Sequence, residues 1–173
     1  MKIRTYFATV FDGMAKGLFA SLIIGTIIAQ IGKIAGIAEI ENIGTIAKYC
    51  MGPSIGAGIA LKRSVKPFTL LAAIAAGAIG AGTVTFANGA AAIAIGEPIG
   101  AFVAAICGIE LGKIVEGKTK IDLLVVPAVV ISTAAVLGIY VSPVIADAFK
   151  ELGVLINKIT EINPLLIDRK SVV

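Results

Sequence analysis

Residues 67–96, PFTLLAAIAAGAIGAGTVTFANGAAAIAIG, contain no charged side chain, and residues 123–146 form a second run of the same kind. A helix that crosses a hydrocarbon core roughly 30 Å thick needs about 20 mostly apolar residues. A helix at the surface of a water-soluble protein would show a polar side chain at every third or fourth position, and neither run does. The two runs therefore predict an integral membrane protein built from helices.

The composition of the whole chain agrees with this prediction. Of its 173 residues, 58% are hydrophobic and 15% are charged, and the mean hydropathy is +1.01. Soluble domains have about 45–50% apolar and about 25% charged residues. The net charge of +4 comes from short basic clusters between apolar runs, so the bilayer is the expected partner and nucleic acid is not.

The chain divides into five apolar blocks, each long enough for one transmembrane helix. They cover approximately residues 17–38, 43–61, 68–86, 90–112 and 123–146. Residues 1–16 do not resemble a cleaved signal peptide, because Asp12 and Lys16 interrupt the apolar stretch. We therefore expect a single domain over residues 1–173, an all-α, polytopic bundle of about five transmembrane helices.

The basic residues between these blocks alternate in a way that predicts orientation. Three precede the first block, three lie between the second and third, and three lie between the fourth and fifth, whereas the other two connections have none. They are Lys2, Arg4 and Lys16; Lys62, Arg63 and Lys66; and Lys113, Lys118 and Lys120. Because cytoplasmic connections carry the excess of Lys and Arg, the N-terminus is expected in the cytoplasm, with the chain in a bacterial-type inner membrane.

After the fifth block, hydrophobic residues recur at helical spacing. This pattern predicts an amphipathic helix over about residues 147–162, lying at the membrane interface. It would either pack over the outer mouth of the bundle or sense the membrane.

Glycines and alanines are spaced four residues apart in several blocks. In the fourth block they form the series Gly96, Gly100, Ala104, Gly108 and Gly112. Small residues on one face of a helix let two backbones approach closely in lipid. The pattern predicts tight helix packing, within the chain or between copies of it.

The triplet Gly96-Glu97-Pro98 interrupts the fourth block. Proline is disfavoured inside a helix and preferred at its first position, so a new helix is expected to start at Pro98, with Glu97 at its N-cap. The segment before it would be separate, making this span discontinuous. A carboxylate inside a membrane is costly unless it is paired or functional, so Glu97 is a candidate for function.

A helix start inside the membrane would suit a ligand site. Its free N–H groups and helix dipole favour a carboxylate, and transporters place substrates at such breaks. The carboxylate could accept hydrogen bonds from two neighbouring hydroxyls of a neutral polyol. The predicted binding residues are Glu97, Pro98, Gly96 and Asn88.

Simpler roles remain open for two of these residues. Glu97 could only cap a kinked helix, paired with Lys33 or Lys48, and Asn88 could be an outer turn residue. No catalytic residue, metal site or cofactor is predicted, because the chain has no His and because Cys50 and Cys107 lie in apolar stretches.

Two longer stretches carry a resemblance to a known family. They are FANGAAAIAIGEPIGAFVAAICGIELGKIVEGKTKIDLLVVPAVV, residues 86–130, and GIYVSPVIADAFKELGVLINKITEINPLL, residues 138–166. The chain resembles the membrane-embedded IIC components of the bacterial phosphotransferase system, in particular the type 2 EIIC family with its perfringolysin regulator-like branch. Because members of that family usually have a second set of spans, the chain looks like an N-terminal half.

The resemblance implies a permease in which a sugar or sugar alcohol binds in the membrane and a phosphorylated soluble IIB protein, itself supplied by IIA, donates the phosphoryl group. The family's glutamate-proline pair at the sugar site matches Glu97 and Pro98. Since the chain has no His and both thiols are expected to be buried, the phosphoryl carrier would belong to the partner. The two basic connections after the second and fourth blocks could dock that partner or could only set topology.

Two functions other than the permease are alternatives. A non-transporting membrane regulatory or scaffold protein would keep the same fold. A homo-oligomeric channel is disfavoured, because a pore usually shows rings of polar residues and the third block has only Thr69, Thr83 and Thr85. In every case we expect a homo-oligomer or a missing C-terminal half to cover the packing faces.

Overall fold

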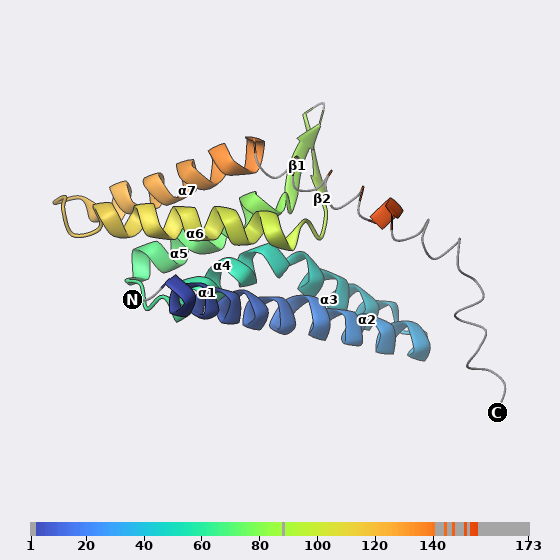
Figure 1. Ribbon diagram of the computed structural model, residues 1–173. Helices are drawn as coiled ribbons and strands as arrows, with labels where there is room; N and C mark the ends of the chain where they lie inside the picture. Colours follow the sequence, from blue (N-terminus) through green and yellow to red (C-terminus); the bar gives the residue numbers. More distant parts are fainter. Residues whose placement is uncertain are drawn as a thin grey trace.

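The computed structural model describes residues 3–87, 89–140, 144, 147, 151 and 153–155, and it is almost entirely helical (Figure 1). The helices are α1 Ile3–Leu18, η1 Phe19–Ile23, α2 Ile24–Ala35, α3 Ala38–Tyr49, α4 Met51–Lys62, α5 Pro67–Ala81, α6 Pro98–Val115 and α7 Asp122–Tyr140. A single antiparallel hairpin pairs strand β1, Val84–Ala87, with strand β2, Ala90–Ile93. The predicted all-α bundle is confirmed.

The first helix is longer than the sequence predicted. The segments α1, η1 and α2 form one continuous helix of 33 residues, Ile3–Ala35, with a π-helical turn at η1. At 1.5 Å per residue it is about 50 Å long. The predicted span began at about residue 17, after Asp12 and Lys16. The helix includes these residues because they pair with each other at 3.1 Å, and Asp12 also pairs with Lys62 at 2.5 Å.

The second predicted span, 43–61, is divided between two helices. Helix α3 ends at Tyr49, Cys50 leaves the helical conformation with φ −78° and ψ 6°, and α4 begins at Met51. Pro53, near the start of α4, has no N–H and so cannot continue the helical hydrogen-bond pattern of α3. Helix α3 packs on α2, and together they form an arm that extends beyond the other helices (Figure 1).

Three helices are long and apolar enough to cross a membrane by length and composition, among the residues that the structure describes: Ile3–Ala35, Pro98–Val115 and Asp122–Tyr140. Helix α5 is apolar but shorter, because the chain turns at Gly82 and enters β1. The number of membrane crossings stays a prediction. So does the interfacial helix over residues 147–162, most of which lies outside the described residues.

Helix α4 lies at the centre of the bundle, between α1 on one side and α5 and α6 on the other (Figure 1). Its Met51, Ile55 and Ile59 are fully buried. Helix α7 packs on the outer side of α5 and α6 through Val126 and Val130. The core therefore consists of two clusters of small and branched side chains, one around α4 and one between α7 and the pair α5 and α6.

Small residues bring these helices together within the chain. The backbone of α1 at Gly13 and Gly17 lies directly against α4, and that of α4 at Gly52 and Gly56 lies directly against α5. A methyl group at Gly13, for example, would come within 2.7 Å of the carbonyl oxygen of Gly58. The predicted close packing across glycine faces is thus seen inside a single copy.

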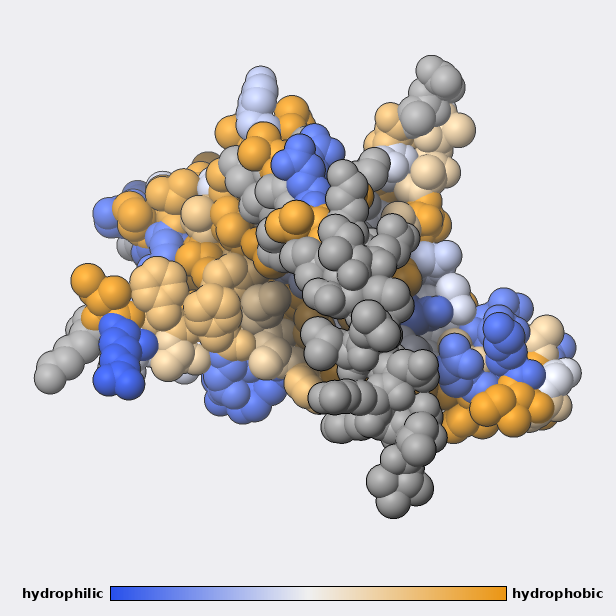
Figure 2. Space-filling view, turned by 45° about the vertical axis from the view of Figure 1, so that its right-hand side comes forward, coloured by the Kyte–Doolittle hydropathy of each residue, from blue (hydrophilic) through white to orange (hydrophobic). Residues whose placement is uncertain are grey.

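Large apolar side chains remain on the outside of the bundle. Figure 2 shows hydrophobic residues over much of one face. Examples on α2 are Ile27, Ile31 and Ile34, of which Ile34 is 86% exposed. Water-soluble monomers rarely expose continuous apolar surface of this extent, so this surface suits lipid or another protein segment.

Candidate functional site

The chain breaks before α6 at the predicted triplet. Helix α6 begins at Pro98, and Glu97 is its N-cap, with an extended backbone at φ −104° and ψ 121°. The segment before it is not a helix, since Ala90–Ile93 forms strand β2. Proline at the first helical position lacks only an N–H that would have no partner within the helix. The predicted helix start at Pro98 is therefore confirmed, whereas the segment before it is a strand and not a helical part of the fourth span.

Three segments of the chain meet at Ala81, the last residue of α5. The N–H of Glu97 donates to the carbonyl oxygen of Ala81 at 2.8 Å. A methyl group on Gly96 would overlap that same oxygen, and one on Gly52 would come within 2.6 Å of the Ala81 Cβ. The first turn of α4 and the start of α6 thus both pack on the end of α5.

Gly96 has a backbone conformation that requires glycine. Its φ is +81°, in the region that residues with a Cβ adopt only with strain. This conformation turns the chain from β2 into the hydrogen bond between Glu97 and Ala81. Gly96 is therefore a residue that positions Glu97, in addition to being one of the predicted binding residues.

Glu97 is half-buried and makes no side-chain hydrogen bond as a cap. It also makes no ion pair with any residue that the structure describes, so the alternative pairing with Lys33 or Lys48 is not observed. Pro98 lies beside it as the first residue of α6. Asn88, the fourth predicted binding residue, lies outside the described residues.

A second polar side chain lies near Ala81 and was not among the predicted site residues. Thr83 is 6% exposed, and its Oγ1 is buried without a hydrogen-bond partner in the described part of the chain. That oxygen is 3.1 Å from the position that a Cβ on Gly52 would occupy. No local sequence signal distinguishes Thr83, because its position depends on the contact between α4 and α5.

One end of the bundle holds the connection from α4 to α5 and the connection from α6 to α7 (Figure 1). We name it the basic end, after the basic residues in and beside these connections: Lys62, Arg63, Lys66, Lys113, Lys118 and Lys120. Glu110 of α6 accepts hydrogen bonds from Tyr6 at 2.9 Å and from the Arg63 side chain at 3.0 Å. The Arg63 guanidinium also lies 4.5 Å from the centre of the Tyr6 ring. This network links α1, the end of α4 and α6.

Two further contacts of charged side chains, one ion pair and one hydrogen bond, lie near the network. The hydrogen bond to the Asp12 carboxylate raises the pKa of Lys62. Thr69 of α5 donates to Glu116 at 3.2 Å. Sequence reasoning treated the basic residues as topology signals and overlooked Glu110, although a carboxylate in the fourth apolar block deserved the same scrutiny as Glu97.

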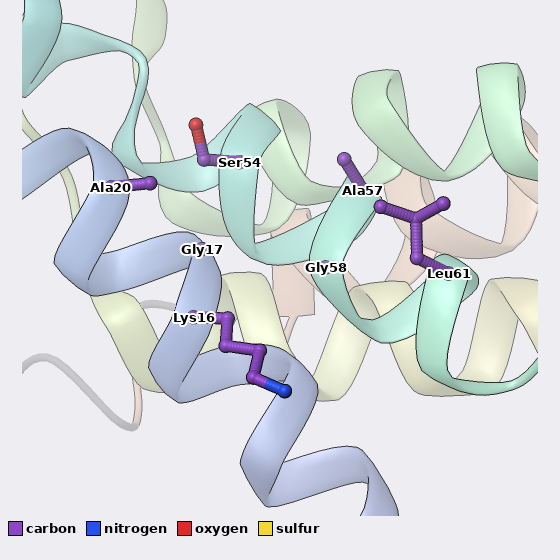
Figure 3. Close-up of a pocket in the computed structure, with 7 residues that line it drawn as sticks. All are labelled: Lys16, Gly17, Ala20, Ser54, Ala57, Gly58 and Leu61. Carbon is purple, nitrogen blue, oxygen red and sulfur yellow. The ribbon is translucent and has the colours of Figure 1, made fainter.

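Among the hollows on the surface of the described residues, two of the larger ones lie apart from Glu97. One, of about 260 Å³, is a groove between α1 and α4. Figure 3 shows its lining of small residues, with Lys16 at one side and the Ser54 hydroxyl at another. The other, of about 380 Å³, lies between the end of α5, β1 and α7, and Thr85 is its main polar residue. Neither offers the several convergent polar groups that a sugar requires.

Comparison with known proteins gives one match. The model of the family described as "Phosphotransferase system, EIIC" matches residues 8–168. That range contains Gly96, Glu97 and Pro98 as well as the basic end. No curated protein and no solved structure matches the chain.

Proposed function

We propose that this chain, which belongs to the phosphotransferase system EIIC family, binds a sugar or sugar alcohol at the break before α6. The family makes it a membrane component of a sugar permease of the phosphotransferase system. The finer proposal is that the bound sugar is phosphorylated by a soluble IIB protein, which IIA recharges. One observation carries the location of the sugar: the carboxylate of Glu97, at the start of α6, is half-buried and has no ion-pair partner among the described residues.

The depth of Glu97 supports this location. Helix α5 has 15 residues and runs from the basic end to Ala81, which is hydrogen-bonded to Glu97. At 1.5 Å per residue, the carboxylate lies roughly 22 Å from the basic end. If the basic end marks one membrane surface, Glu97 lies inside a hydrocarbon core of roughly 30 Å. A polar ligand would account for an unpaired carboxylate at that depth.

The chemistry of the site suits a neutral polyol. A carboxylate accepts hydrogen bonds from two neighbouring hydroxyls, and such bonds to a charged group are about twice as strong as neutral ones. The chain's own residues would thus bind and orient the sugar, and the chain contributes no His that could carry a phosphoryl group.

The basic end is the proposed docking surface for the phosphorylated partner. Lys66, Lys113, Lys118 and Lys120 make no ion pair with the described residues, so they are available to an acidic or phosphorylated surface. The positive-inside rule places this end, and with it the N-terminus, in the cytoplasm. The basic end lies roughly 22 Å from Glu97. The sugar would therefore have to move from Glu97 toward the basic end before phosphoryl transfer.

The hairpin is the main support for a proposed homo-oligomer. Phe86 is 78% exposed and Ile93 is 60% exposed, and among the described residues no further strand pairs with the outer edge of either strand. Open sheet edges are not tolerated in lipid, and apolar side chains of this size are unfavourable in water. Another copy of the chain would cover the strand edges and these side chains. Light scattering on the chain purified in detergent should therefore show an oligomer, and a monomer would contradict the proposal.

Replacing Glu97 with glutamine tests the proposed function. We expect the variant to bind sugar roughly 10- to 100-fold more weakly, because it loses hydrogen bonds to a charged acceptor. Glucose, fructose and mannitol would be titrated into the purified chain in lipid nanodiscs, with thermal unfolding as the measurement.

The matched control is Glu41→Gln, which makes the same chemical change at an exposed position in the first turn of α3. It should leave the sugar-dependent shift unchanged. Equal shifts in the Glu97→Gln variant and the original chain would contradict a sugar site at Glu97. If the folded original chain shows no shift with any of the sugars, the regulatory or scaffold alternative is favoured instead.

A further inference from the structure

We propose, on the basis of the sugar site described above, that the hydroxyl of Thr83 is a second direct contact of the bound sugar. Glu97 supplies an acceptor on one side of Ala81, and Thr83 supplies a group that can both donate and accept. The two together would fix the orientation of the sugar, which a single carboxylate leaves free.

The hydroxyl of Thr83 differs from four hydroxyls in the described helices that donate to the backbone. Thr9, Thr26 and Thr133 each donate to a carbonyl oxygen four residues earlier, at 2.7–2.8 Å. Ser21, which is also buried, does the same at 2.8 Å. Thr83 follows the end of α5, where the chain has turned at Gly82, and its Oγ1 has no partner among the described residues. A buried hydroxyl without a partner is unfavourable and requires an explanation.

In this conformation, hydrogen bonds hold the backbone of Thr83 at the same junction as Glu97. Its N–H donates to Ala78 at 3.1 Å, and its carbonyl oxygen accepts from Ala94 at 2.9 Å. Its Oγ1 faces the first turn of α4, since it lies 3.1 Å from the Cβ position of Gly52. The first N–H groups of a helix have no partner within the helix, so this surface is itself suited to polar ligand atoms.

Access to Thr83 requires the hairpin to move away from α4. The segment between Gly82 and Gly96 includes Thr83 and both strands, and it is bounded at each end by a glycine with positive φ, +65° and +81°. Because its carbonyl oxygen accepts from Ala94, Thr83 would move with the hairpin, which breaks its N–H bond to Ala78 and its contact with Gly52. Glycines at both ends provide the backbone freedom for such a hinge.

Replacing Thr83 with valine tests the inference, because valine has nearly the same shape without the hydroxyl. We expect sugar affinity to fall about five- to tenfold, as for the loss of a neutral hydrogen bond. The thermal stability of the sugar-free chain should stay the same or rise, since an unpartnered buried hydroxyl is removed. Thr83→Ser keeps the hydroxyl and should bind within about twofold of the original chain. The probes are again glucose, fructose and mannitol in nanodiscs.

The Glu97→Gln variant, measured in the same experiment, separates this inference from the proposed function. If Glu97→Gln weakens binding and Thr83→Val does not, Thr83 is no sugar contact, although the site at Glu97 stands. If neither variant weakens binding, or no probe binds the original chain, both proposals are overturned. A valine variant that unfolds more readily without sugar would show a structural role for the hydroxyl and would also overturn the inference.

Discussion

Replacing Gly96 with alanine is expected to lower the free energy of unfolding by about 3 kcal/mol. Two effects add. The backbone of Gly96 has φ +81°, where a residue with a Cβ is strained by roughly 1–2 kcal/mol. The added methyl group would also overlap the carbonyl oxygen of Ala81, which accepts the N–H of Glu97 at 2.8 Å. Relieving that overlap moves the start of α6. Unfolding by a denaturing detergent in mixed micelles would measure the loss.

The matched control for Gly96→Ala is Gly82→Ala. Gly82 is in the same connection between α5 and α6 and also has a positive φ, +65°, but a Cβ there meets nothing within 4 Å. It should show only the backbone strain, roughly 1–2 kcal/mol. The difference between the two variants therefore measures the contact of Gly96 with Ala81. Equal losses would show that the start of α6 is not held against the end of α5.

The break before α6 was predictable because its signals are local. Proline at a first helical position and a preceding glycine act on their own backbone, whatever the rest of the chain does. The hairpin could also have been predicted. The dipeptide Asn88-Gly89 is a typical sequence signal for a two-residue turn, and the third and fourth predicted blocks are divided there, but the uncharged run from residue 67 to 96 favoured helices over strands on both sides of it.

The bounds of the first two helices were not predictable from local sequence. Asp12 and Lys16 indicated a segment outside the membrane, whereas the structure pairs Asp12 with Lys62 from α4. The break at Cys50 has a local cause in Pro53, but the separation of α3 from α4 depends on tertiary structure, since α3 packs on α2 while α4 packs on α1 and α5. These contacts join residues distant in the sequence, which periodicity does not report.

The candidate site shows the same division. Glu97 was predictable from the energetic cost of a carboxylate in an apolar block. Thr83 was not, because threonine is common in apolar spans and the position of its buried hydroxyl next to Gly52 depends on the packing of α4. Glu110 lies between these cases. Its charge was visible in the sequence, and its partners, Arg63 and Tyr6, come from α4 and α1.

The second large effect is expected at the centre of the bundle. Gly56→Val should lower the free energy of unfolding by about 3 kcal/mol or more. A Cβ at Gly56 would overlap the carbonyl oxygen of Ala73 and lie 2.8 Å from the carbonyl carbon of that residue. Because these are backbone atoms of α5, no side chain can rotate away, and α4 must separate from α5. The same unfolding measurement in mixed micelles applies.

Ala57→Val is the control for Gly56→Val, on the same helix and one residue further on. Ala57 lines the groove of about 260 Å³ between α1 and α4, where Figure 3 shows its side chain on the open side of α4. The added methyl groups have room there, so the change should stay within about 1 kcal/mol. A general effect of valine on α4 would affect both variants equally, whereas contact between the α4 and α5 backbones affects only Gly56. Similar losses in the two variants would therefore contradict close packing of α4 on α5, and with it the position of Gly52 against Ala81 and Thr83.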